Sequence, residues 1–549
     1  MAQRAEALAR PSAAVAPAAD ALRVLLTTEG TYPFQWGGLS TWCHALTREL
    51  PEIAFTLIAL NDDPLGELRF PLQENVVEFR SVPIWGVRRA WELGRGRGSR
   101  AQRHMGSRSL DPAVQKRFVP AYRQFLAQVL GAKRDDEQLA SALHEMYRFL
   151  SRNDFDAVFR SRPVWDALCE EVDARFPPLA ERLGYGDARV SYAELAAASQ
   201  WVYHWFFPLA EPLPSVDIAH ATMGGICSLV ALVCKLEHGS GFLLSEHGIY
   251  LRECYLAEHK SADDLFGKVF KLGFARRITE ISYAYADAIA PCCDYNHRWE
   301  RRLGVGQGRI HTAYYGIDGP TDEPHAQRPD GGPVIVWAGR IDPLKDLETL
   351  LRAAAIVNET HPAARFLLYG AAATASEDYY ERCLALHREL KLDGVVSFEG
   401  YATNVFEAFG RADLVVLSSI SEGFPFSTLE AMLCGKPVVA TAIGGVAEQI
   451  TPECGRIVGP RAPKALAAAI AELLADPDLR QRLGAAARLR AASLFGLERF
   501  RSTHRSIYDD LIAKRVQPAH RLEIVEVFEK QSGRLHLREA TTPREKALR

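Results

Sequence analysis

The chain has 549 residues, which is long enough for more than one hydrophobic core and favours two or more domains. Hydrophobic residues make up 48% of it and charged residues 24%, as in a soluble globular protein, and no run of about 18 apolar residues predicts a membrane span. With a formal net charge of −3, the chain lacks the basic field that would indicate binding to nucleic acid or to an anionic membrane surface.

The start of the chain, residues 1–20, is rich in alanine and proline and has no continuous apolar core. We therefore expect a disordered lead-in and not a signal peptide.

The ten cysteines are dispersed, without a CxxC pair, and most lie in apolar surroundings. This pattern favours buried, reduced thiols over a disulfide framework or a zinc site, and it predicts a cytoplasmic protein.

A first α/β lobe is predicted over residues 21–325. Short apolar runs that suit buried parallel strands lie at 23–27, 55–60, 216–220, 241–245 and 286–291, and helical patterns lie at 39–50 and 264–285. Between about 86 and 210 the pattern changes, because 113–130 and 137–150 have helical periodicity and no strand of comparable quality is found there. We therefore expect a helical insertion in this lobe.

The polar segment 320–333, with several prolines and glycines, predicts a linker between domains. The alternation of strands and helices then restarts, which predicts a second α/β lobe over 326–496. Its expected strands are 334–338, 366–369, 395–398, 414–417 and 438–440, and its expected helices are 347–357, 379–390, 463–474 and 479–494. After a helix at 497–515, the tail 516–549 alternates apolar and polar residues as a hairpin would.

Two carboxylates eight positions apart, Glu422 and Glu430, straddle the junction between a strand and a helix. Glu422 follows the strand at the end where open α/β sheets bind ligands, and Glu430 lies in the first turn of the helix. Ionised carboxylates accept hydrogen bonds from sugar or ribose hydroxyls, and the free N–H groups at a helix start attract a diphosphate. The segment Ser427-Thr428-Leu429-Glu430 is also a capping box, which alone would account for Glu430.

With seven residues between Glu422 and Glu430, the chain resembles the retaining GT-B glycosyltransferases of family 4. Within that family it is most similar to the PelF-like branch of exopolysaccharide synthesis, through Thr28-Glu29-Gly30-Thr31-Tyr32-Pro33-Phe34 and Ser245-Glu246-His247-Gly248-Ile249-Tyr250. The resemblance implies an α/β protein of the GT-B class, with two Rossmann-like lobes facing a central cleft. The first lobe would receive the acceptor, the second would bind the nucleotide-sugar donor, and the helix 497–515 would cross back to the first lobe.

Two basic residues, Arg340 and Lys345, lie in the loop after the strand 334–338. A guanidinium can bridge two phosphate oxygens and an ammonium adds a point charge, and both interactions strengthen as a leaving diphosphate gains negative charge. An isolated pair of this kind is more often solvated on the surface. The resemblance implies instead that Arg340 and Lys345 contact the donor pyrophosphate.

Gly37 and Gly38 join the first strand to its helix, where glycines let backbone N–H groups approach a phosphate. The loop is neither GxGxxG nor a P-loop, which disfavours a dehydrogenase or an ATPase, and a plain tight turn is the default explanation. The resemblance places this loop against the donor phosphates.

The resemblance also places His247 near the reacting sugar. A neutral imidazole there can bind a hydroxyl or act as a base, although a lone histidine is more often structural.

The loop after the strand 395–398 would hold the nucleotide base by resemblance, although core packing would equally explain Tyr401. The resemblance thus implies a catalytic set of His247, Arg340, Lys345 and Glu422, and a donor-binding set of Gly37, Gly38, Tyr401, Thr403, Val405, Gly423, Phe424, Pro425 and Glu430.

We expect no metal ligand and no cofactor. Neither Asp154-Phe155-Asp156 nor Asp476-Pro477-Asp478 follows an apolar strand, as a metal–nucleotide motif would.

These patterns favour a retaining hexosyltransferase that moves a sugar, by resemblance glucose from UDP-glucose, to a growing glycan in exopolysaccharide synthesis. Its partners would be the nucleotide sugar, the glycan acceptor and, as a further candidate, a membrane polysaccharide synthase, with no nucleic acid. Three alternatives stay open: a sucrose, trehalose or glycogen synthase-like transferase with a soluble acceptor, a GT-B epimerase, and a non-catalytic GT-B scaffold of a polysaccharide synthase complex.

Overall fold

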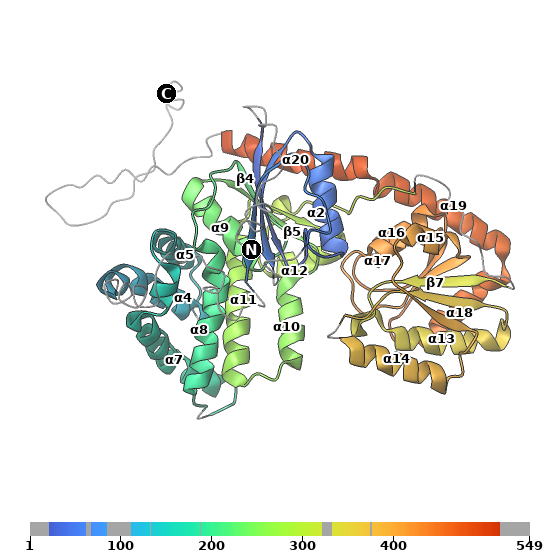
Figure 1. Cartoon of the computed structure of the whole chain (residues 1–549), viewed down its shortest axis with the longest axis horizontal. Coiled ribbons are helices and arrows are strands. Elements are labelled where there is room, and N and C mark those ends of the chain that lie inside the picture. Colours follow the sequence, from blue (N-terminus) through green and yellow to red (C-terminus); the bar gives the residue numbers. More distant parts are fainter. Residues whose placement is uncertain are drawn as a thin grey trace, which may run out of the picture.

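The computed structural model describes residues 21–61, 67–84, 111–131, 133–186, 188–320, 332–373 and 376–516. The expected lead-in, most of the expected linker and the expected hairpin in the tail lie outside these described residues. Two parallel six-stranded sheets, each covered by helices, form two lobes (Figure 1). The prediction of an α/β protein with two Rossmann-like lobes is therefore confirmed.

The first sheet has the strand order β3-β2-β1-β4-β5-β6 and is parallel throughout. Its strands are β1 (Arg23–Glu29), β2 (Ala54–Asn61), β3 (Val76–Pro83), β4 (Ile218–Ala221), β5 (Gly241–Glu246) and β6 (Ala288–Pro291). In the central strand β1, Val24 pairs with Phe55 on one side and with Ile218 on the other. Because helices cover both faces of the sheet, the central strands are continuous apolar runs, which makes them recognisable in the sequence.

The helices that connect these strands belong to the first lobe. They are α2 (Gly38–Glu49), α9 (Ile226–His238), α10 (Tyr250–Lys260) and α11 (Leu265–Tyr285), followed after β6 by η4 (Asp294–Asn296), α12 (His297–Arg302) and η5 (Gln307–Arg309). α9 is apolar on nearly all sides and lies buried, whereas α10 has only Leu251 fully buried. α10 therefore stands at the open side of the lobe that faces the second lobe (Figure 1).

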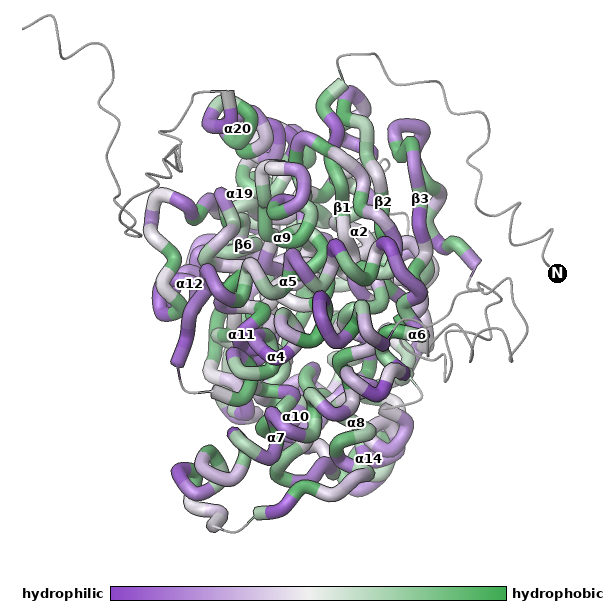
Figure 2. The backbone as a smooth tube through the Cα atoms, turned by 90° about the vertical axis from the view of Figure 1, so that its left-hand side faces the viewer, coloured by the Kyte–Doolittle hydropathy of each residue, from purple (hydrophilic) through white to green (hydrophobic). Residues whose placement is uncertain are grey.

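Between β3 and β4 the chain forms a group of helices at the end of the first lobe away from the second (Figure 1). They are η2 (Val114–Phe118), α4 (Val119–Leu130), α5 (Asp136–Leu150), α6 (Phe155–Phe159), α7 (Arg162–Arg182), α8 (Tyr192–Phe206) and η3 (Phe207–Leu209). Figure 2 looks onto this end and shows α4, α5 and α11 next to one another, each mixing hydrophobic and hydrophilic residues. In α5, Leu139, Leu143 and Met146 are buried along one helical face, and Asp135 caps the first turn.

The second sheet repeats the topology of the first, with the order β12-β11-β10-β7-β8-β9. Its strands are β7 (Val334–Ala338), β8 (Arg365–Tyr369), β9 (Val396–Gly400), β10 (Leu414–Leu417), β11 (Val438–Thr441) and β12 (Gly455–Val458). Its helices are η6 (Pro343–Lys345), α13 (Leu347–Thr360), α14 (Glu377–Glu389), α15 (Val405–Gly410), α16 (Phe426–Leu433), α17 (Val446–Gln449), α18 (Pro463–Ala475) and α19 (Pro477–Leu494). β7 and β10 lie side by side at its centre, as β1 and β4 do in the first sheet.

The sequence analysis missed the strands β3 and β12. In β3 the half-buried Glu78 and Arg80 pair with each other at 2.7 Å, and in β12 Arg456 binds Glu472 of α18 at 2.8 Å. Both strands lie at sheet edges, where one side of the strand has no neighbour and polar residues are tolerated. The other strands were predicted from continuous apolar runs, and the polar residues of β3 and β12 interrupt such a run.

The chain passes between the lobes twice, and the two crossings touch each other. The Ile317 N–H donates to the carbonyl oxygen of Phe495 at 2.9 Å, and a Cβ on Gly316 would lie 2.3 Å from the Cβ of Phe500. Phe500 lies in α20 (Leu497–Val516), which leaves the second lobe and packs against α2, β4 and β5 of the first (Figure 1). The last described helix is thus shared by both lobes.

All ten cysteines are free thiols, and seven of them are buried, as the sequence predicts. The adjacent Cys292 and Cys293 place their sulfur atoms 4.0 Å apart. Within the described residues, none of the helices combines the length and the apolar character that a membrane crossing requires.

A buried guanidinium ties the helical insertion to α11. Arg277 is 4% exposed and donates to Asp136 of α5 at 2.8 Å and to Glu280 at 2.7 Å. Its neighbour Arg276 also binds Glu280, at 2.8 Å, but its side chain is 42% exposed. We predict that Arg277→Ala lowers the free energy of unfolding by about 3 kcal/mol, because it removes one partner of a buried ion pair.

The matched control is Arg276→Ala, which should cost less than about 1 kcal/mol because the pair that it breaks is solvated. Chemical denaturation of the two variants measures both effects. Equal losses would show that the buried pair contributes no more than the exposed one.

Candidate functional site

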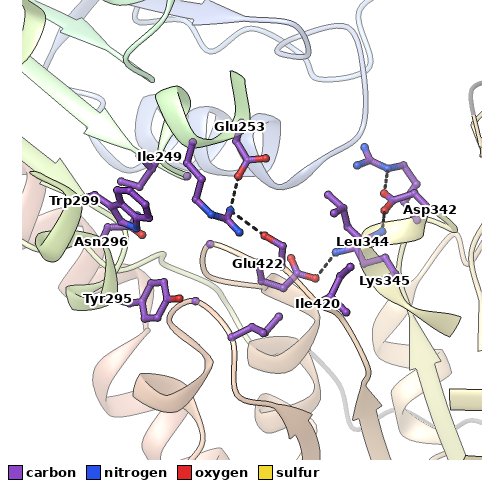
Figure 3. A pocket seen from close by; sticks show the side chains of 17 residues that line it. Ile249, Glu253, Tyr295, Asn296, Trp299, Asp342, Leu344, Lys345, Ile420 and Glu422 are labelled. Atoms are coloured by element: carbon purple, nitrogen blue, oxygen red, sulfur yellow. Dashed lines mark hydrogen bonds and ion pairs between the residues drawn. The ribbon is translucent and has the colours of Figure 1, made fainter. Parts of the chain in front are cut away.

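The loops after the central strands of both sheets meet at one cavity. In each sheet the strand order reverses between two adjacent strands, β1 and β4 in the first and β7 and β10 in the second. Ligands of open α/β sheets bind beyond the carboxyl ends of the strands at such a switch point. A cavity of about 270 Å³ lies between the lobes (Figure 3). Its lining includes Ile249, Tyr295 and Trp299 of the first lobe and Arg340, Lys345 and Glu422 of the second.

Lys345 and Glu422 form an ion pair in the second-lobe wall of this cavity. Lys345 ends η6 after β7, Glu422 follows the neighbouring strand β10, and the Lys345 Nζ lies 2.5 Å from Glu422 Oε1. The same oxygen accepts from Ser419 Oγ at 2.6 Å, while Ser418 Oγ donates to the Lys345 carbonyl at 2.8 Å. Both charged side chains are mostly buried and held in place. Among the described residues no donor forms a hydrogen bond with the other oxygen, Glu422 Oε2. This oxygen can therefore accept a hydrogen bond from a ligand.

Arg340 lies at the rim of the same cavity. Its side chain is 67% exposed, and its Nε lies 2.9 Å from Asp342 Oδ2. The other oxygen of the buried Asp342 accepts the Leu344 N–H at 2.8 Å and so caps η6. Because the carboxylate engages one edge of the guanidinium, the remaining N–H donors of Arg340 can bind a phosphate. The structure therefore brings Arg340, Lys345 and Glu422 together.

Glu430 does not cap its helix. α16 begins at Phe426 with Pro425 as its N-cap, and no side chain caps it, so the capping-box explanation of Glu430 is wrong. The Glu430 side chain lies outside the lining of the 270 Å³ cavity. Burial raises the pKa of the Glu430 carboxyl to about 7, and no described residue donates a hydrogen bond to it. A partly buried carboxyl without a hydrogen-bond partner costs stability.

His247 precedes Gly248 of the cavity lining, but its own side chain lies outside that lining. Its Nδ1 shares a 3.0 Å hydrogen bond with the hydroxyl of Tyr315, and its ring packs edge-on against Trp42 with centroids 4.4 Å apart. Its Nε2 is buried and has no partner within the described residues. Burial, followed by the nearby His504, lowers the pKa of His247 to about 3, so the imidazole is neutral at pH 7. A neutral ring with one unused nitrogen can bind a ligand hydroxyl.

Glycines let the two lobes approach each other. A Cβ on Gly423 would lie 2.1 Å from the carbonyl oxygen of His247, so only glycine fits there. A Cβ on Gly38, at the start of α2, would lie 3.4 Å from the ring of Phe426 at the start of α16. Gly37 is the N-cap of α2, and neither of these helix starts has a side-chain cap. Two uncapped helix starts that face each other across the cleft suit an anion.

The other predicted donor residues lie outside the cavity lining. Phe424 is 3% exposed, and Pro425 serves as the N-cap of α16. Thr403 is exposed in the loop between β9 and α15, and Val405, the first residue of α15, packs against the core. Tyr401 is 61% exposed, so the alternative that it packs in the core is wrong. No group of three or more histidine, cysteine or acidic side chains suited to a metal ion occurs within the described ranges.

Sequence reasoning missed the first-lobe wall of the cavity. Ile249, Tyr295 and Trp299 line this wall together with the ion pair of Arg252 and Glu253, on the side opposite Lys345 and Glu422 (Figure 3). Ile249 lies in the segment 245–250 that the sequence analysis singled out, and this is the one signal that pointed to the wall. Tyr295 and Trp299 belong to no recognisable motif, and only the fold places them at the cavity.

Two side-chain contacts connect the lobes beside the cavity. Arg252 of α10 donates to Glu253 at 2.8 Å and, across the cleft, to Ser421 at 3.1 Å. Glu448 of α17 accepts two backbone N–H groups, including that of Tyr295, from the start of η4 at 2.8 Å each. Residues of each lobe therefore hold residues of the other in place.

Two family matches divide the chain. Residues 22–307 match "Domain of unknown function (DUF3492)", and residues 320–490 match "Glycosyl transferases group 1". Glycogen synthase of Mycobacterium tuberculosis is 31% identical over 246 residues, which are 44% of this chain and 58% of that protein. D-inositol 3-phosphate glycosyltransferase of Salinispora arenicola is 31% identical over 192 residues, which are 34% of this chain and 43% of that protein. The chain thus spans little more than half of the first relative and less than half of the second.

Two solved structures share the arrangement of both lobes. Sucrose-phosphate synthase of Thermosynechococcus elongatus superimposes with a TM-score of 0.56 and 18% identity, covering 90% of this chain and 100% of that one. Alr3699/HepE of Anabaena in complex with UDP superimposes with a TM-score of 0.55 and 14% identity, covering 88% and 99%. At these identities the likeness establishes the fold alone. The chain therefore belongs to the family described as "Domain of unknown function (DUF3492)", its second lobe matches the glycosyl transferases of group 1, and its fold is that of the GT-B glycosyltransferases.

Proposed function

We propose that the protein is a retaining glycosyltransferase that moves a sugar from a nucleoside-diphosphate sugar to a growing glycan. The observation that carries this proposal is the meeting of Arg340, Lys345 and Glu422 at one cavity between two Rossmann-like lobes. Two cations suit a diphosphate leaving group, and a carboxylate suits the hydroxyls of a sugar. The match of residues 320–490 to the glycosyl transferases of group 1 supports the same class of reaction.

Each charged group has a defined task in the proposed reaction. The bond from the anomeric carbon to the diphosphate oxygen breaks while the acceptor hydroxyl attacks the same face, and the departing phosphate oxygen takes the acceptor proton. Arg340 and Lys345 stabilise the charge that grows on the diphosphate. Glu422 Oε2 binds sugar hydroxyls and orients the ring. We assign the same task to His247, whose Nε2 would have to be uncovered from its buried position to reach the sugar. The products are a nucleoside diphosphate and a glycan that keeps the anomeric configuration of the donor.

The rest of the donor would extend along the cleft between the lobes. We assign the diphosphate to the facing starts of α2, at Gly37 and Gly38, and of α16, with Gly423 in the loop before it, and the ribose hydroxyls to Glu430. The loop 401–405 would contact the base. We infer UDP-glucose as the donor, because Alr3699/HepE of Anabaena, which shares the fold, is solved with UDP-glucose.

For the place of the reaction we propose exopolysaccharide synthesis in the cytoplasm, which the PelF-like segments and the cysteines support. Segments 28–34 and 245–250 favour a role in exopolysaccharide synthesis, with a membrane polysaccharide synthase as the partner. Ten free thiols favour the cytoplasm, where thiols stay reduced.

We predict that UDP and UDP-glucose stabilise the full chain in the presence of EDTA, because Arg340 and Lys345 already supply positive charge to the diphosphate. At about 100 times Kd the ligand should add about 2.7 kcal/mol to the free energy of unfolding. Thermal shift and calorimetry measure the effect. Stabilisation that requires Mg²⁺ or Mn²⁺ would contradict the charge assignment, and stabilisation by ADP but not UDP would contradict the choice of base.

We predict that Arg340→Ala and Lys345→Ala each lower kcat about 10²-fold, as the loss of a preorganised charge at a leaving group does. The control is Arg382→Ala, which breaks an exposed ion pair with Glu348 (3.8 Å) and should leave the rate unchanged. Steady-state transfer of labelled sugar measures the rates, and NMR of the product reads the anomeric configuration. A folded Lys345→Ala variant with the wild-type kcat would rule out the proposed task of Lys345.

We predict that Glu430→Gln weakens donor binding and yet stabilises the empty protein at high pH. The pKa of Glu430 is about 7 in the folded chain against an ordinary value of 4.5, so folding favours its protonated form. This contribution is fully present below about pH 4.5 and is lost as the pH rises through 7. Glutamine cannot ionise, so the gain in melting temperature over wild type should be larger at pH 8 than at pH 5. A variant that is less stable at pH 8 and binds UDP normally would indicate a purely structural residue.

A further inference from the structure

One hydrogen bond decides which nitrogen of His247 carries the proton. Burial, followed by the nearby His504, lowers the pKa of His247 to about 3, so at pH 7 the neutral ring has one N–H and one acceptor nitrogen. We propose that Tyr315 is a positioning residue that keeps His247 in the tautomer with its proton on Nε2. Through Nε2 this histidine can then donate a hydrogen bond to a sugar hydroxyl but cannot take a proton as a base. The proposal rests on the proposed glycosyltransferase function and specifies the role of His247 in it.

The direction of the hydrogen bond follows from the chemistry of the tyrosine. The hydroxyl of Tyr315 lies 3.0 Å from Nδ1 of His247. Burial, followed by the nearby Cys292, raises the pKa of this hydroxyl well above its usual value, so the hydroxyl keeps its proton. A buried O–H group needs an acceptor, and the unprotonated nitrogen of a neutral imidazole is a good one. If Nδ1 carried the proton and donated it to the tyrosine, the hydroxyl proton would need another acceptor.

The thiol of Cys292 is the group that competes for this proton. The contact with Cys293, followed by burial, raises the pKa of Cys292 well above its usual value, so its sulfur is a thiol and not a thiolate. A thiol sulfur is only a weak acceptor. The Cys292 S–H is also engaged as a donor, to the carbonyl oxygen of His247 at 3.5 Å. The hydroxyl of Tyr315 therefore donates to Nδ1, and the proton of the imidazole stays on Nε2.

Aromatic packing holds both partners of this hydrogen bond in place. Tyr315 is 5% exposed, and its ring stacks on Phe426, with centroids 4.6 Å apart and 16° between the planes. Phe424 packs edge-on against the same ring at 5.6 Å, and Trp42 packs against the ring of His247 at 4.4 Å. Phe424 and Phe426 belong to the second lobe and His247 to the first. Contact between the lobes therefore sets the tautomer.

The tautomer determines what the free nitrogen of His247 can do. Nε2 is buried and has no hydrogen-bond partner within the described part of the chain. A buried N–H group without a partner costs free energy, and a sugar hydroxyl that reached it would recover this cost. Because Nε2 already bears a proton, the proton of the acceptor hydroxyl must go elsewhere. This agrees with the proposed reaction, in which the departing phosphate oxygen takes that proton.

The first experiment reads the tautomer directly in the full chain. Long-range proton–nitrogen correlation spectra of protein with isotope-labelled histidines distinguish a protonated ring nitrogen from an unprotonated one. The signals of His247 are those that disappear in His247→Gln. We expect a protonated Nε2 and an unprotonated Nδ1 in the wild type, and a changed Nδ1 signal in Tyr315→Phe, which removes only the hydroxyl. A proton on Nδ1 in the wild type would overturn the proposal.

The second experiment measures the effect of the hydroxyl on the reaction. Tyr315→Phe should lower kcat about tenfold, as the loss of one buried hydrogen bond would. Donor KM and stabilisation by UDP should stay at wild-type levels, because the ring still stacks on Phe426. The control is Tyr147→Phe in α5, where a tyrosine that is 3% exposed accepts the Leu213 N–H at 2.9 Å, and its kcat should be unchanged. A wild-type kcat in Tyr315→Phe would contradict the positioning role.

Two substitutions of His247 distinguish a donor from a base. The amide of His247→Gln supplies an N–H donor but is no base, whereas His247→Met fills the space without a donor. We expect His247→Gln to keep kcat within about tenfold of the wild type and His247→Met to lose about tenfold more. Tyr315→Phe should cause no further loss in the His247→Met background, because the two residues act as one unit. Equal losses in the two His247 variants would overturn the donor role.

Wild-type behaviour keeps the two levels of inference apart. If the protein neither hydrolyses nor transfers sugar from any nucleotide donor, the proposed function fails, and the spectra still decide the tautomer. If the protein transfers sugar and both His247 variants do so at the wild-type rate, the donor role of His247 is overturned while the glycosyltransferase function stands.

Discussion

Nothing larger than a hydrogen atom fits on the α-carbon of Gly423, because the carbonyl oxygen of His247 faces it from the other lobe. The same loop is held from behind, where the Gly445 N–H donates to the carbonyl of Gly423 at 2.8 Å and a Cβ on Gly444 would lie 2.1 Å from the carbonyl of Glu422. This close backbone contact sets the distance between the lobes. The width of the cavity, and so the reach from the second-lobe wall to the first-lobe wall, depends on it.

The ionic groups of the cavity occur as balanced pairs, and this has a physical reason. Isolated charges are costly in a partly buried place, so each cation is kept with a carboxylate. Lys345 with Glu422 and Arg340 with Asp342 are thereby held in position before any ligand arrives. In the proposed reaction, an incoming diphosphate would meet cations whose geometry needs little rearrangement, which is the condition under which electrostatic stabilisation of a leaving group is most effective.

The sequence was sufficient to predict features that depend on local pattern. The central strands are apolar runs covered on both faces, and loops such as the one with Lys345 follow them directly, so both could be located. Features that depend on tertiary packing could not be predicted from the sequence. The edge strand β3 has the polar pair Glu78 and Arg80, and the capping-box pattern at Glu430 proved misleading because Pro425 already starts the helix. Tyr295 lies at the cavity because of how its turn η4 and the following helix α12 pack in the first lobe. No local sequence pattern indicates this position.

The double passage between the lobes determines how the molecule can move. One flexible connection would let the lobes twist and slide in many directions, but here the segment at Ile317 and the segment at Phe495 are hydrogen-bonded to each other. Any movement of one lobe against the other must therefore either preserve this contact or break it. A residue larger than glycine at position 316 would collide with Phe500 and push the two connections apart.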